Sequence, residues 1–201
     1  MATLDSDLSG PRDACGVIGM YAPGQQVANS TYLGLYALQH RGQESAGIAV
    51  SDGETITVVK DMGLVTQVFD ERRLAPLEGH LAIGHVRYST TGSSTWRNAQ
   101  PVYRSVGDAG FSLGHNGNLT NTEELADDLG MLPGVLTSDS ELVGELVARE
   151  YDDDKSTRSD GRDLERGQAT LIEDLGDEAH VLYDRDRLAV AHRDALSLIH
   201  I

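Results

Sequence analysis

The sequence is short of several residue types, and each shortage excludes a class of protein. A single cysteine, Cys15, excludes disulfides within the chain and cysteine-rich metal or iron–sulfur sites. Two lysines and 14 arginines face 32 acidic residues, and the net charge of −16 excludes a general nucleic-acid binder. No apolar run approaches the roughly 18 residues of a membrane span, and the first 14 residues lack the apolar stretch of a signal peptide. We therefore expect an acidic cytoplasmic protein with neither nucleic acid nor membrane as a partner.

The remaining composition predicts one folded domain preceded by a polar arm, Met1–Ala14. The hydrophobic patterns predict strands at 15–21, 46–50, 55–60, 81–88, 111–115, 180–183 and 188–192. Helices are predicted from Ser30 as a cap to His40, from Thr122, from a capping box at Ser138 and Glu141, and around 169–175. The charged stretch 151–167 is expected to be a linker or surface excursion. This mixed order predicts an α+β fold of stacked antiparallel sheets with helices outside.

Cys15 is the first residue of the first predicted strand and directly follows the arm. A thiol is a strong nucleophile when a base removes its proton. Cleavage after Ala14 would give Cys15 a free α-amine with a pKa near ~8, beside its own sulfur. The alternative, a buried structural cysteine, remains open at this point.

Three polar segments follow predicted strands or begin a predicted helix. Arg87 offers a planar fork that can hold a carboxylate through two hydrogen bonds. Asn116 and Gly117 offer a carboxamide and an unobstructed backbone N–H to a developing oxyanion. Asp139 places a carboxylate at a helix start. An exposed arginine, an Asn-Gly turn and an ordinary first-turn acid are the alternative interpretations.

Five segments in this order form a pattern that resembles a known family. They are Cys15–Gly19, Leu38–Ile48, Gly84–Thr90, His115–Leu119 and Ser138–Glu141. Together they resemble the class II glutamine amidotransferase domain of the amidophosphoribosyltransferase family, over about Cys15 to Asp194. The resemblance implies the four-layer αββα sandwich of the N-terminal nucleophile hydrolases, and a chain that releases ammonia from glutamine.

The resemblance also implies roles for individual residues. Cys15 matches the nucleophile that propeptide removal frees, and its α-amine matches the general base. Asn116 and the Gly117 N–H match the oxyanion hole.

Four further residues match the part of the family that binds glutamine. Arg87 matches the group that holds the α-carboxylate, with Thr90 beside it on the glutamine loop. Asp139 matches the partner of the α-ammonium. Arg41 lies in the family's signature turn near the nucleophile and is given a supporting role.

The family pairs this domain with a phosphoribosyltransferase domain, which adds the ammonia to phosphoribosyl pyrophosphate to form 5-phosphoribosylamine in the first step of de novo purine synthesis. We expect that domain to be missing from this chain, because the resemblance stops at Asp194, and we expect 195–201 to be a truncated or non-family tail. We expect no cofactor or metal in this chain, Mg²⁺ in the missing domain, and a homo-oligomer at full length. Two alternatives remain: the glutaminase domain of another class II amidotransferase, and a non-catalytic module that senses glutamine through Arg87 and Asp139.

Overall fold

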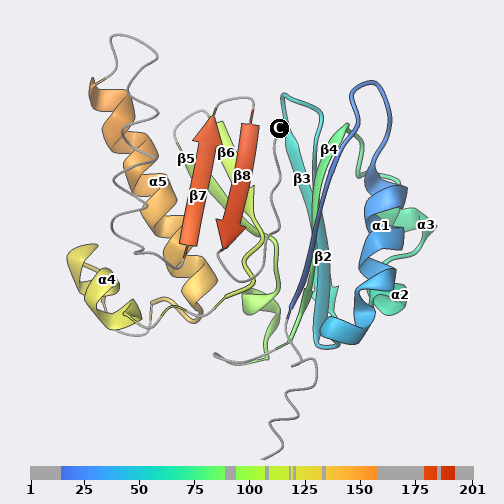
Figure 1. The fold of residues 1–201 in the computed structure, drawn as a ribbon, viewed down its shortest axis with the longest axis horizontal. Helices are drawn as coiled ribbons and strands as arrows, with labels where there is room; N and C mark the ends of the chain where they lie inside the picture. The colour runs from blue at the N-terminus through green and yellow to red at the C-terminus, as the bar shows by residue number, and fades with distance from the viewer. Residues whose placement is uncertain are drawn as a thin grey trace, which may run out of the picture.

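The computed structural model of the chain has three antiparallel sheets, one of four strands and two of two strands, with helices on both outer sides (Figure 1). The structure describes residues 15–88, 94–106, 109–117, 119, 121–132, 135–157, 179–184 and 187–192. The predicted α+β class and the αββα layering are confirmed. The arm, the tail and Thr90 lie outside the described residues.

The first sheet has the strand order β1-β4-β2-β3 and is antiparallel throughout. Its strands are β1 (Gly16–Tyr21), β2 (Ser45–Ser51), β3 (Ile56–Met62) and β4 (Leu81–Arg87). The predicted hairpin joins β2 to β3, where Gly53 has a φ of +100° that favours glycine. Gly16 pairs with Val86, and Ser45 pairs with Arg87. The starts of β1 and β2 therefore lie on either side of the end of β4.

Three helices cover the outer face of this sheet (Figure 1). They are α1 (Ala28–Ala37), α2 (Val65–Val68) and α3 (Glu71–Leu74), and a 3₁₀ helix, η1 (Gln39–Arg41), follows α1. The prediction that Ser30 caps the first helix is wrong, because α1 begins at Ala28 and has no side-chain cap. The sequence did not predict α2 and α3, since one turn of helix is too short to show a 3.6-residue period.

The other half of the molecule is built on strands β5 (Val102–Val106) and β6 (Ala109–Leu113) and helices α4 (Thr122–Asp128) and α5 (Asp139–Thr157). Half of the predicted capping box is confirmed, because the Ser138 Oγ accepts a hydrogen bond from the Glu141 N–H at 3.3 Å. The Glu141 carboxylate instead accepts from the Thr137 N–H at 2.9 Å. Helix α5 buries its apolar side in a cluster separate from that of the first sheet. That cluster contains Val102, Val106, Phe111, Leu113, Leu119, Leu125, Leu142, Val143, Leu146 and Val147.

The sequence missed one strand of this half, two of its expectations are wrong, and one lies outside the described residues. Strand β5 was not predicted, and β6 ends at Leu113, before the predicted end at His115. Residues 151–157 belong to α5, so the first part of the expected linker is helical. The helix expected around 169–175 lies outside the described residues.

The predicted last hairpin is confirmed as β7 (Ala179–Asp184) and β8 (Arg187–His192), which pair with each other. In the described part of the chain, no helix combines the length and apolar character needed to cross a membrane.

Strands β2 and β3 lie close against the segment that leads into β5. A Cβ atom on Gly47 of β2 would overlap the carbonyl oxygen of Gln100. From β3, the Lys60 Nζ donates hydrogen bonds to the carbonyl oxygens of Ala99 and Pro101. Backbone of one half therefore lies directly against backbone of the other, with no side chain between them.

Substituting Gly47→Ala should lower the free energy of unfolding by about 1–3 kcal/mol, because the added methyl forces the two sheets apart. The matched control is Gly144→Ala in α5, where a Cβ makes only ordinary contacts of 3.5 Å with Arg104 and Val102. That change should stabilise the chain by about 0.5–1 kcal/mol, since alanine favours the helix. Urea denaturation of both variants measures the two effects, and equal stabilities would contradict the close approach.

Candidate active site

The sulfur of Cys15 lies at the start of β1, against the end of β4. Its Sγ is 3.5 Å from the Tyr88 carbonyl oxygen, to which the thiol donates, and it accepts a hydrogen bond from the Tyr88 N–H at 3.4 Å. Burial raises the pKa of the Cys15 thiol, and the Tyr88 hydrogen bond and the Arg87 charge partly oppose that rise. The thiol is therefore mostly protonated at neutral pH and needs a base to become a nucleophile.

Two side chains from distant segments hold the carbonyl oxygen of the same residue. The Arg41 Nε, from η1, donates to the Cys15 carbonyl oxygen at 3.1 Å. The Asn116 Nδ2, from the turn after β6, donates to it at 2.9 Å. The structure therefore brings together three segments that the sequence predicted to share a site. Gly117, half-buried, is the next residue of that turn.

Arg87 ends β4 with a guanidinium group that is 5% exposed. Its Nη1 forms an ion pair with the Glu44 Oε2 at 3.2 Å, and Glu44 is 27% exposed. The sequence predicted Arg87 as a carboxylate-binding residue but did not identify Glu44. The available signal was the position of Glu44 directly before Ser45, the residue that pairs with Arg87 across the sheet.

Asp139, which the sequence predicted as the partner of the α-ammonium, begins α5. Its Oδ1 accepts from the Ser140 N–H at 2.8 Å, and its Oδ2 accepts from the Leu119 N–H at 3.3 Å. The charge of Asp139 raises the pKa of Cys15, whereas the charge of Arg87 lowers it. The charges of Arg87 and Asp139 are therefore both close enough to the sulfur to change the pKa of Cys15.

Behind the Asn116 turn lies a buried polar cluster that the sequence did not predict as a unit. Its members, each at most 5% exposed, are His85, Gln100, His115 and Ser140. Burial lowers the pKa of His85 to about 3, so its imidazole is neutral. In the described part of the chain, no group of three or more His, Cys, Asp or Glu side chains is arranged to hold a metal ion. Hydrogen bonds join the members of this cluster to one another.

The two opposite charges near Cys15 should change its reactivity in opposite directions. Arg87→Gln should raise the pH at which the thiol reacts with iodoacetamide, and Asp139→Asn should lower it, because only the thiolate reacts. Intact mass after labelling between about pH 6 and pH 10 follows the reaction without ambiguity, since the chain has one cysteine. A common pH midpoint for the wild type and both variants would place these charges away from the sulfur.

Comparisons with known proteins agree on one family. The family model for class II glutamine amidotransferases matches residues 20–200. The amidophosphoribosyltransferase of Mycobacterium leprae is 59% identical over 150 residues, which are 71% of this chain and 27% of that protein. The amidophosphoribosyltransferase of Synechococcus elongatus is 54% identical over 149 residues, covering 71% of this chain and 30% of that protein. The chain thus spans less than a third of the length of these two curated relatives.

Solved structures give the same result for the fold. The glutamine phosphoribosylpyrophosphate amidotransferase from B. subtilis, complexed with ADP and GMP, superimposes with a TM-score of 0.68 at 33% identity. This match covers 88% of the present chain and 36% of the B. subtilis chain. Sequence family, fold and the contacts around Cys15 agree, and the chain belongs to the class II glutamine amidotransferases.

Proposed function

We propose that this chain is the glutaminase part of an amidophosphoribosyltransferase. It releases ammonia from glutamine, and the ammonia reacts with phosphoribosyl pyrophosphate to give 5-phosphoribosylamine at the start of purine synthesis. The observation that carries the proposal is the position of the Asn116 carboxamide, which lies 2.9 Å from the carbonyl oxygen of the cysteine it would serve. The names of the relatives favour this enzyme over other class II amidotransferases.

Glutamine is a zwitterion, so its site needs one fixed cation and one fixed anion. Arg87 binds the α-carboxylate in this proposal, and Asp139 binds the α-ammonium. The Arg87 guanidinium pairs with Glu44 at 3.2 Å, and in this proposal the substrate carboxylate binds beside that pair. Each charge-assisted contact contributes about 1.5–3 kcal/mol to binding.

The reaction begins with a proton transfer, because burial keeps the Cys15 thiol protonated. After cleavage of the Ala14–Cys15 bond, the free α-amine accepts the thiol proton and the sulfur attacks the side-chain carboxamide carbon. The oxyanion accepts hydrogen bonds from the Gly117 N–H and the Asn116 Nδ2. The Nδ2 carries two hydrogens, so donation to the Cys15 carbonyl leaves one for the oxyanion. Ammonia departs with the proton from the amine, and water then hydrolyses the γ-glutamyl thioester to glutamate and free thiol.

Other parts of the proposal concern the longer protein. The phosphoribosyl pyrophosphate site and its Mg²⁺ belong to the portion of the relatives that this chain does not match, and no step above depends on that metal. We also propose that the longer protein is cytoplasmic and that it forms a homo-oligomer.

The chain that begins at Cys15 should release glutamate and ammonia from glutamine in equal amounts. The chain that keeps residues 1–14 should not, because its cysteine nitrogen is an amide and cannot accept a proton. Cys15→Ser should abolish the reaction, since a hydroxyl is a much weaker nucleophile. Glutamate assays and N-terminal sequencing test this, and full activity in a chain that retains Met1 would contradict the mechanism.

Two substitutions separate binding from chemistry. Arg87→Lys keeps the charge but loses the fork, so it should raise KM for glutamine and leave kcat nearly unchanged. Asn116→Ala should lower kcat by about 10²–10³, the usual loss for one oxyanion donor. Steady-state kinetics measures both, and an effect of Asn116→Ala on KM alone would remove Asn116 from the oxyanion hole.

A further inference from the structure

The carboxamide of Gln100 makes three hydrogen bonds inside the protein. Its Oε1 accepts from the His115 N–H at 2.6 Å, and its Nε2 donates to the His115 carbonyl oxygen at 3.1 Å. The same Nε2 donates to the Ser140 Oγ at 3.0 Å. Gln100 is 4% exposed, so water does not compete for these contacts.

The two residues that Gln100 holds are the immediate neighbours of two proposed site residues. His115 directly precedes Asn116, and Ser140 directly follows Asp139. Both backbone polar groups of His115 are fixed by one side chain, so the start of the Asn116 turn has little freedom to shift. Ser140 belongs to the first turn of α5, and its Oγ and N–H both bond the Asp139 carboxylate.

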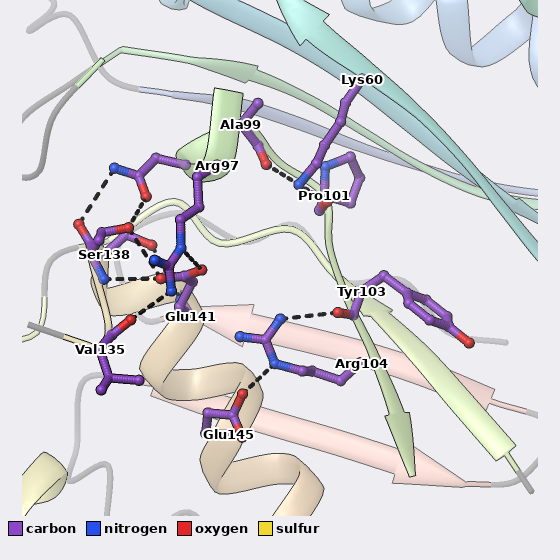
Figure 2. A network of polar contacts seen from close by, with 12 residues as sticks. Lys60, Arg97, Ala99, Pro101, Tyr103, Arg104, Val135, Ser138, Glu141 and Glu145 are labelled. Atoms are coloured by element: carbon purple, nitrogen blue, oxygen red, sulfur yellow. Dashed lines mark hydrogen bonds and ion pairs between the residues drawn. The ribbon is translucent and has the colours of Figure 1, made fainter. Parts of the chain in front are cut away.

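The backbone of Gln100 is itself fixed from the other sheet. Lys60 of β3 donates to the carbonyl oxygens of Ala99 and Pro101, the residues on either side of Gln100 (Figure 2). Gly47 of β2 leaves room for the Gln100 carbonyl oxygen where any larger residue would not. Contacts therefore run without a break from the first sheet, through Gln100, to the Asn116 turn and the start of α5.

We propose that Gln100 is a positioning residue that sets the place of Asn116 relative to Asp139, and thus of the oxyanion donor relative to the carboxylate that binds the substrate ammonium. This inference rests on the proposed function. Gln100 touches neither the sulfur nor the glutamine. It acts through His115 and Ser140.

The contacts require a carboxamide at this position. The His115 N–H needs an acceptor, whereas the His115 carbonyl and the Ser140 Oγ each receive a donated hydrogen. A glutamate has the acceptor but, when ionised, no hydrogen to donate, and its second oxygen would face the His115 carbonyl oxygen. His85 supports the same carbonyl: its Nε2 lies 3.1 Å away and carries the hydrogen, because a carbonyl oxygen only accepts.

The test compares Gln100→Glu and Gln100→Met with Ser112→Ala, in the chain cleaved before Cys15. Ser112 is as buried as Gln100, and its Oγ donates to the Val102 carbonyl oxygen at 3.1 Å, away from the Asn116 turn. Both Gln100 variants should lower kcat by between about 10-fold and 100-fold, as expected for a displaced catalytic donor. Ser112→Ala should lower the unfolding midpoint but keep kcat near the wild-type value. A Gln100→Glu variant with wild-type kcat would overturn the proposal.

A double-mutant cycle with Asn116→Ala distinguishes positioning from general loosening. If Gln100 acts through Asn116, adding Gln100→Glu to Asn116→Ala should reduce kcat little further. Two losses that multiply would overturn the proposal and leave the glutaminase assignment intact. Absence of glutaminase activity in the wild-type chain would overturn the proposed function.

A measurement without turnover tests the positioning in either case. NMR amide exchange should show a protected His115 N–H in the wild type and in Ser112→Ala, and faster exchange in Gln100→Met with shifted Asn116 side-chain signals. Unchanged Asn116 signals in Gln100→Met would overturn the inference.

Discussion

The carbonyl oxygen of Cys15 is the point on which the candidate site depends. It accepts hydrogen bonds from Arg41 and Asn116, which are 26 and 101 residues away along the chain. The sulfur belongs to the same residue, so any shift of this carbonyl also moves the sulfur. The Asn116 turn and the turn that contains Arg41 are thereby both fixed to one atom. The Tyr88 backbone adds a fourth segment on the sulfur side.

The charges around this point are balanced although the chain as a whole is strongly acidic. Arg87 is paired with Glu44, and the Asp139 carboxylate is satisfied by backbone N–H groups. Arg87 and Asp139 act on the Cys15 thiol in opposite directions, so burial remains the largest influence on its pKa. The charges around Cys15 therefore do not by themselves deprotonate its thiol. The proton acceptor must be supplied separately, and the α-amine of Cys15 is the nearest one that cleavage would create.

Local patterns predicted much of the fold, and the reason is physical. Strands β1, β2, β3 and β4 have apolar runs bounded by turn residues, and the Ser138 cap is a contact within one turn of helix. Cys15, Arg87, Asn116 and Asp139 were candidates from their chemistry and position, and the resemblance to a family grouped them into one predicted site. Gln100 and Glu44 were not predicted, because their roles arise from partners more than ten residues away. A buried carboxamide and an exposed one look the same in a sequence.

The pairing of β1 with β4 has a consequence for the order in which the protein matures. Within the described sheet, β1 hydrogen-bonds only to β4, and Gly16 meets Val86. The ribosome therefore releases the cysteine-bearing strand long before the strand that receives it, whereas β2 and β3 can pair as a local hairpin at once. The Tyr88 contacts of Cys15 can form together with this pairing, whereas the Asn116 contact forms later still, after residue 116 has emerged. Cys15 thus reaches its folded surroundings late in synthesis, and in the proposed function a cleavage that requires those surroundings cannot precede the Asn116 contact.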